Sequence, residues 1–172
     1  MPQTSHVLKN AADWKMLLLW WAVYICIPLL SYFGRPLQRF SESVVERGTI
    51  STAISALLIG LVTGSIILII RRHGLLYALH LLWLVPVLVF IHLGLPNFVE
   101  RIHFALFGLF GFLSLRLFPT AAALSLYALI SILDEVFQWV LPDRVGDIRD
   151  VFFNLTACLI GAAVAWIAGK QS

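Results

Sequence analysis

The late part of the chain carries acidic and amide residues at a spacing suited to acid–base chemistry. Asp134 and Glu135 are adjacent, and Gln138 follows three residues after Glu135. On a helix, residues three or four apart share a face, so the Glu135 and Gln138 side chains would project together. A carboxyl group can exchange a proton and an amide can orient polar atoms. We therefore expect one polar face on the helix that holds this segment.

A second polar group follows after a short turn. Arg144 lies in the turn, and Asp150 and Asn154 come after it, four residues apart and so on one helix face. The Arg guanidinium suits an anionic phosphate because it can bind two oxygens at once. In a purely structural interpretation, Asp150 satisfies free N–H groups at a helix start, and Asn154 hydrogen-bonds to a neighbouring helix.

Composition indicates what kind of helices carry these residues. Of 172 residues, 60% are hydrophobic and only 12% are charged, whereas soluble domains have about 45–50% and about 25%. The sequence therefore predicts an integral membrane protein. The 12 Lys and Arg residues are scattered and form no basic stripe, so no nucleic-acid partner is expected. There is no His pair at metal-ligand spacing and no phosphate-binding glycine loop, so we predict no metal and no cofactor.

Six apolar segments approach the length of about 20 residues that a helix needs to cross a bilayer. The predicted fold is all-α, a polytopic transmembrane helical bundle of about six spans, with five as the alternative. The spans are expected at residues 14–33, 50–70, 74–95, 98–117, 120–141 and 150–168. Between the first two spans, residues 36–48 predict either a short helix lying in the membrane interface or a loop. Residues 1–97 carry no recognisable motif and residues 98–168 carry the polar groups, within one bundle.

Counting six spans also predicts which residues reach the same side of the membrane. The turn before the fourth span and the turn after the fifth emerge together, so His103 would lie at a depth similar to that of Glu135. The Lys and Arg residues divide equally between the two sides, and the positive-inside rule gives a tie. We expect both termini inside, because Arg101, Arg144 and Arg149 can be held by a site on the opposite side.

The polar groups give a set of candidate site residues. The candidate catalytic residues are Glu135, His103 and Asp150, and the candidate substrate-binding residues are Asp134, Gln138, Arg144 and Asn154.

The spacing of these residues resembles the signature of the VanZ-like membrane protein family. The family pattern is D-E-x-x-Q, an Arg after a short turn, then D-x-x-x-N followed by glycines, and Asp134 to Asn154 match it. Gly161 fits the second glycine, and Ala157 stands where the first is usual. His103-Phe104 is similar to the family's His-Phe motif, with Glu100 in the place of the usual Lys. The resemblance implies a bacterial inner-membrane protein related to one named from glycopeptide-antibiotic resistance.

Three functions fit these residues. In the first, the site binds or modifies the headgroup of an envelope lipid or a polyprenyl-linked cell-wall precursor, with Arg144 on the anionic group and Glu135 or His103 exchanging a proton. In the second, Glu135, Arg144 and Asp150 form a non-catalytic latch between helices. In the third, the chain is a small proton-coupled transporter, although its polar residues crowd one leaflet and no internal repeat is present.

Overall fold

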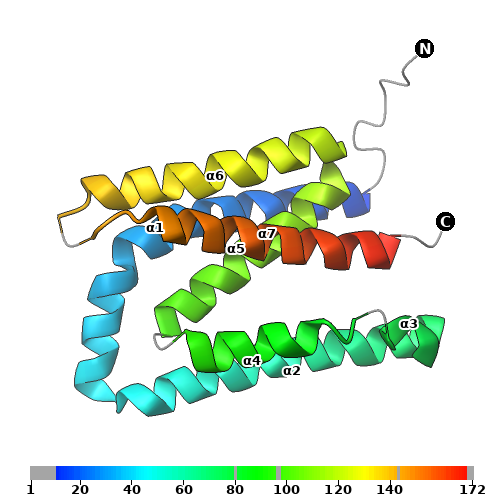
Figure 1. The fold of residues 1–172 in the computed structure, drawn as a ribbon, viewed down its shortest axis with the longest axis horizontal. Helices are drawn as coiled ribbons and strands as arrows, with labels where there is room; N and C mark the ends of the chain where they lie inside the picture. Colours follow the sequence, from blue (N-terminus) through cyan, green and yellow to red (C-terminus); the bar gives the residue numbers. More distant parts are fainter. Residues whose placement is uncertain (1–10, 80, 96–97, 143, 170–172) are drawn as a thin grey trace. The chain divides into compact units, whose positions relative to one another are not determined.

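The fold is taken from a computed structural model that describes residues 11–79, 81–95, 98–142 and 144–169. In this part of the chain every regular element is an α-helix, which confirms the all-α prediction. The helices are α1 (Ala11–Val44), α2 (Arg47–His73), α3 (Leu75–Leu79), α4 (Leu84–Gly94), α5 (Phe98–Leu117), α6 (Thr120–Val140) and α7 (Ile148–Gly169), drawn in Figure 1.

Among the described residues, four stretches of helix are long and apolar enough to cross a membrane. They are Asp13–Val44, Phe98–Leu117, Thr120–Val140 and Ile148–Ala168. The second expected span lies in α2, which has 27 residues and a length of about 40 Å at 1.5 Å per residue. The helices of the last three predicted spans begin and end within about two residues of the expected positions.

The third expected span, residues 74–95, is not one helix, and this part of the prediction is wrong. A five-residue helix, α3, is followed by a turn at residues 81–83 and then by α4. In the turn, Leu84 N–H bonds to Leu81 O and Val85 N–H bonds to Leu82 O, both three residues back. Pro86 supplies a physical reason, because proline has no N–H and fits only the first turn of a helix. Beginning α4 at Leu84 places Pro86 in that turn.

The first expected span is longer than predicted, because α1 continues to Val44. Residues 36–44 are therefore helical, as one of the two interpretations held, but they extend α1 rather than form a separate helix. Local side-chain hydrogen bonds stabilise these turns. The Gln38 amide donates to Glu42 over 2.9 Å, and the hydroxyls of Ser41 and Ser43 donate to carbonyls three residues earlier.

The helices divide into two compact units. One unit contains residues 1–29 and 106–172, and the other contains residues 30–105. In the first unit, α6 packs against α7, and the two lie side by side in Figure 1. The Trp20 indole N–H of α1 donates to Ser114 Oγ of α5 over 2.7 Å, and Tyr127 O–H of α6 donates to Gly111 O over 2.7 Å.

Glycines bring α5 and α7 into backbone contact within the first unit. A Cβ atom at Gly161 would collide with the carbonyl oxygen of Gly108, and one at Gly111 would collide with the backbone of Cys158. Ala157 is fully buried beside them. Small residues at a helix interface allow such close approach in membrane proteins. Ala157, which stands where the resembled pattern usually has its first glycine, is small enough for this contact.

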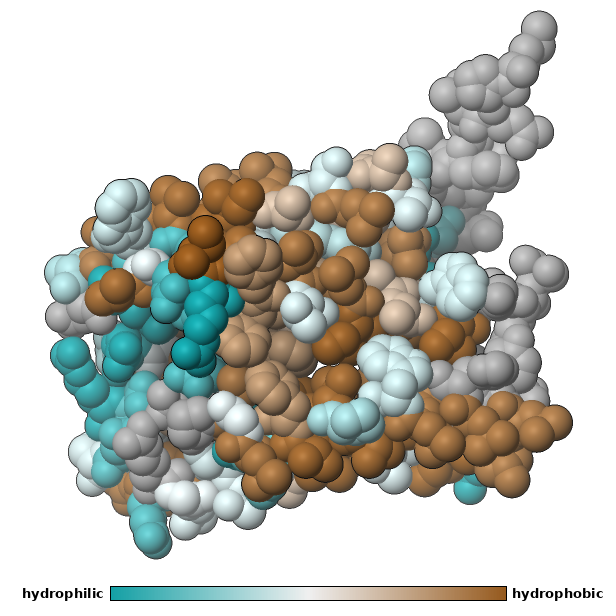
Figure 2. Space-filling view, in the orientation of Figure 1, coloured by the Kyte–Doolittle hydropathy of each residue, from teal (hydrophilic) through white to brown (hydrophobic). Residues whose placement is uncertain are grey.

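In the second unit, α2 packs against α3 and α4. Large apolar side chains cover the outer faces of these helices, and a brown apolar band follows them in Figure 2. Leu57, Leu82 and Leu93 are all more than half exposed. A surface this apolar is expected where lipid, rather than water, surrounds the helices.

Candidate functional site

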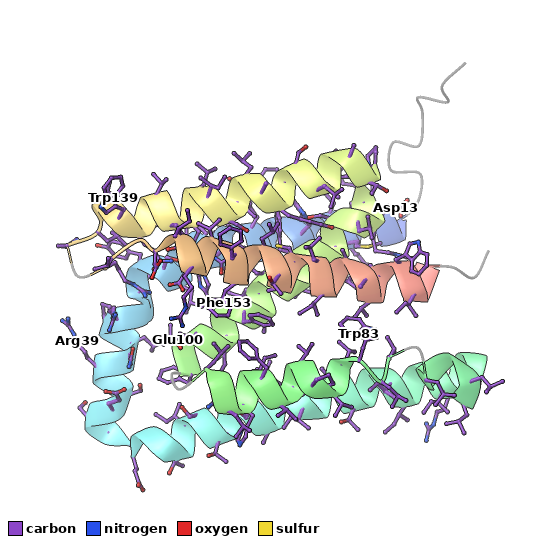
Figure 3. All side chains as sticks on the ribbon, in the orientation of Figure 1. Asp13, Arg39, Trp83, Glu100, Trp139 and Phe153 are labelled. Carbon is purple, nitrogen blue, oxygen red and sulfur yellow. The ribbon has the colours of Figure 1, made fainter. Side chains whose placement is uncertain are left out.

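Helix α6 turns its polar residues inward and its apolar residues outward. Asp134, Glu135 and Gln138 are at most 7% exposed. The exposed residues near them are Leu129, Ile132, Leu133, Val136 and Trp139. Figure 3 shows Trp139 projecting outward from the C-terminal end of the helix. Such an arrangement is costly in water and favourable in lipid, because the apolar side chains face the hydrocarbon and the polar ones find partners within the protein.

The three polar side chains of α6 contact one another directly. Gln138 Nε2 donates to Asp134 Oδ2 over 2.8 Å and to Glu135 Oε1 over 3.1 Å. These bonds follow from the helical spacing, since Asp134 and Glu135 lie four and three residues before Gln138. Both N–H groups of the amide are thereby used on the two carboxyl groups. The sequence-predicted polar face is present in the structure.

Helix α7 contributes an amide to the same pair of carboxyl groups. Asn154 is 4% exposed, and its Nδ2 lies 3.3 Å from Glu135 Oε1 and 3.5 Å from Asp134 Oδ2. Both distances are at the long end for hydrogen bonds. The spacing within the sequence placed Asn154 on a face with Asp150, and the packing of α6 on α7 brings it to Glu135. We refer to Asp134, Glu135, Gln138 and Asn154 as the carboxyl–amide cluster.

The turn between α6 and α7 closes over one end of the cluster. The backbone N–H of Asp147 donates to Glu135 Oε2 over 3.1 Å, so both oxygens of this carboxyl group accept hydrogen bonds. Gly146 makes the approach possible, because a Cβ atom there would collide with the carbonyl oxygen of Glu135. A loop residue thus participates in the site through its backbone, and no side-chain pattern in the sequence predicts such a contact.

The remaining predicted residues lie around the cluster or in the other unit. Arg144 lies in the α6–α7 turn and Asp150 in the first turn of α7; both are half-buried and both have interaction partners. His103 is half-buried on the part of α5 that belongs to the second unit. Its expected approach to Glu135 stays a prediction. Arg149, by contrast, is exposed, and its Cζ lies 5.2 Å from the ring centre of Phe153, the α7 residue labelled in Figure 3.

A buried arginine in the second unit, Arg101, was expected to be held by a site, and the structure shows it bound to partners outside the carboxyl–amide cluster. Arg101 is 5% exposed, and its guanidinium donates to His92 O and Leu95 O at the end of α4. It also donates to Ser51 O over 2.6 Å and to the Ser55 hydroxyl, both on α2. A cation at a helix C-terminus is favourable because the free carbonyls there carry partial negative charge. The sequence signal for this network was the pair Ser51 and Ser55, two polar residues four apart in a predominantly apolar segment.

No metal centre is evident in the described part of the chain. Nowhere among those residues do three or more His, Cys, Asp or Glu side chains gather at a distance suited to one ion. The carboxyl–amide cluster contributes two carboxyl groups and two amides.

Comparison with known families agrees with the motif. A family model described as VanZ/LLP1 matches residues 16–169. The match therefore includes the first spans, in which the sequence showed no motif, as well as the carboxyl–amide cluster. No curated protein and no solved structure matched the chain.

Proposed function

Because the chain belongs to the VanZ/LLP1 family, we propose that it is a bacterial inner-membrane protein that binds or modifies the headgroup of an envelope lipid. The ligand class is a phospholipid or a polyprenyl-linked cell-wall precursor, and such a ligand would link the protein to glycopeptide resistance. The observation that carries the proposal is the burial of two adjacent carboxyl groups within a membrane-spanning helix. An ionised carboxylate at the bilayer centre costs at least about 2.5–3.5 kcal/mol, and ionisable residues inside membrane-spanning helices commonly have a function.

Each residue of the proposed site has a separate role. Arg144 binds the anionic part of the headgroup from the α6–α7 turn. Glu135 exchanges a proton with the ligand, together with His103 or Asp150 if the site is catalytic. Gln138 and Asn154 hold the carboxyl groups in position through their amide N–H groups. The termini lie on the cytoplasmic side, which places the cluster near the outer leaflet.

Native mass spectrometry of the detergent-purified protein tests the proposal. We expect a co-purifying lipid on the wild-type protein and at least a tenfold lower lipid-bound fraction for Arg144→Ala and Glu135→Gln. Arg149→Ala is the matched control, because this neighbouring exposed arginine contacts the Phe153 ring instead of the cluster. Equal lipid occupancy in all four proteins would refute the proposal.

A second function is favoured by the bonds that Asn154 makes across α6 and α7. In this alternative the carboxyl–amide cluster is a latch that holds two helices together. Interhelical hydrogen bonds of this kind contribute about 0.6 kcal/mol on average and up to about 1.7 kcal/mol. If the latch is the whole role, Glu135→Gln lowers the unfolding temperature and leaves lipid occupancy unchanged.

A further inference from the structure

Ser131 is a buried hydroxyl without a partner, one helical turn from the carboxyl–amide cluster. Its side chain is fully buried, and its Oγ has no hydrogen-bond partner. Among the described residues, Ser131 Oγ is the one buried side-chain oxygen or nitrogen that has no hydrogen-bond partner. A buried unsatisfied hydroxyl in a native protein calls for an explanation, because desolvating it costs free energy that no protein contact returns.

The position of Ser131 connects it to the cluster. Ser131 and Glu135 are four residues apart on the buried face of α6. Residues four apart on a helix are neighbours on one face, so Ser131 belongs to the turn before Glu135. Ser131 therefore lies directly on the membrane-interior side of Glu135, about 6 Å deeper at 1.5 Å per residue.

The neighbouring buried hydroxyls show that this fold normally satisfies such groups. Tyr127, one further turn along the same face, donates its O–H to Gly111 O over 2.7 Å. Ser114, also fully buried, accepts the Trp20 indole N–H over 2.7 Å. The hydroxyl without a partner is thus next to the carboxyl groups, where the proposed ligand enters. Lipid tails cannot satisfy it, because hydrocarbon has no hydrogen-bonding groups.

We propose that Ser131 is a binding residue for an acceptor oxygen of the lipid just below its headgroup. The Ser131 O–H donates to this oxygen while the headgroup occupies the carboxyl–amide cluster. The inference rests on the proposed function, and it adds that the ligand reaches one turn deeper than the cluster. Two lipid oxygens have this chemistry, namely the ester carbonyl of a diacyl phospholipid and the phosphate-ester oxygen of a polyprenyl phosphate.

Substitution of Ser131 should change the unfolding temperature and the lipid affinity differently from substitution of a serine with a purely structural role. Ser131→Ala removes an unsatisfied group from the free protein, so its unfolding temperature should equal or exceed that of the wild type. The same change removes one hydrogen bond from the complex, and we expect about a tenfold loss of lipid affinity. Ser114→Ala is the matched control, because it should lower the unfolding temperature and leave lipid affinity unchanged.

The experiment is a lipid titration of delipidated protein followed by native mass spectrometry. The probes are a diacyl phospholipid, its diether analogue without ester carbonyls, and a polyprenyl phosphate. If the ester carbonyl is the partner, the Ser131→Ala effect is present with the diacyl lipid and absent with the diether lipid. If the phosphate-ester oxygen is the partner, all three lipids bind Ser131→Ala about tenfold more weakly than they bind the wild type.

Two outcomes distinguish a failure of the proposed function from a failure of the role of Ser131. If Glu135→Gln loses lipid while Ser131→Ala binds every probe as the wild type does, the proposed function stands and the role of Ser131 is refuted. If Glu135→Gln binds every probe with wild-type affinity, the proposed function is refuted. Ser131→Cys provides a second variant that keeps a weaker donor at the same position, and it should bind with affinity between the wild type and Ser131→Ala.

Discussion

Replacing Gly161 by alanine should separate α7 from α5, whereas the same change at Gly108 should be tolerated. A Cβ atom at Gly161 would collide with the carbonyl oxygen of Gly108 and lie 2.9 Å from the backbone N of Phe112. A Cβ atom at Gly108 would lie 3.6 Å from Ala157 O, an ordinary van der Waals contact. Both positions are within helices, so the two substitutions differ in the space available to one methyl group.

The magnitude follows from two opposing contributions. Alanine in place of glycine favours a helix by about 1 kcal/mol. Overpacking a tight contact costs about 1–3 kcal/mol, and here the obstacle is backbone, which cannot rotate away as a side chain can. At Gly161 the steric contribution is at the upper end, so we expect a net loss of about 1–2 kcal/mol. At Gly108 the helix contribution dominates, and stability should be equal or slightly higher.

Thermal unfolding of the detergent-purified variants, followed by tryptophan fluorescence, measures this difference. For a chain of this size 1 kcal/mol corresponds to about 2–4 °C, so Gly161→Ala should unfold about 2–8 °C below the wild type. Gly161→Ala should also reduce lipid occupancy, because α7 carries Asn154, whose bonds to the carboxyl groups are already 3.3 and 3.5 Å long. Equal unfolding temperatures for Gly161→Ala and Gly108→Ala would refute the reasoning.

Two further substitutions test the networks in each unit. Arg101→Lys should lower the unfolding temperature by about 4 °C or more, which corresponds to a loss of more than about 2 kcal/mol in unfolding free energy. The reason is that one ammonium group cannot replace the four guanidinium hydrogen bonds to α2 and to the end of α4. An unchanged unfolding temperature would mean that Arg101 does not hold these helices. Asn154→Ala should lower the unfolding free energy by no more than about 1 kcal/mol, because the two hydrogen bonds of the Asn154 amide are long. A decrease above about 2 kcal/mol, with lipid occupancy unchanged, would favour the latch.

The sequence predicted the helices whose signals are local. Hydropathy and length gave the spans that became α5, α6 and α7, because each is an uninterrupted apolar run bounded by polar or turn residues. The i, i+3 and i, i+4 spacing also predicted that Gln138 would share a face with Glu135. These features depend on residues within one helix, so no knowledge of packing was needed.

Features that depend on contacts between distant segments were not predictable in the same way. Arg101 bonds to Ser51 O, 50 residues away, and the Trp20 indole bonds to Ser114, 94 residues away. The break before Leu84 had a local signal in Pro86, but average hydropathy over 20 residues conceals a single proline. The collision at Gly161 is likewise a property of two helices, and the sequence alone cannot supply their separation.

A latch between α6 and α7 explains only part of the buried polar face. It explains the amides of Gln138 and Asn154, because both donate to the two carboxyl groups. It leaves Ser131 unexplained, because a serine that only held helices together would have a partner on one of them. A latch at this position would be more stable with alanine, at no structural cost. The unsatisfied hydroxyl therefore favours a site that is completed by a ligand over one that is complete within the protein.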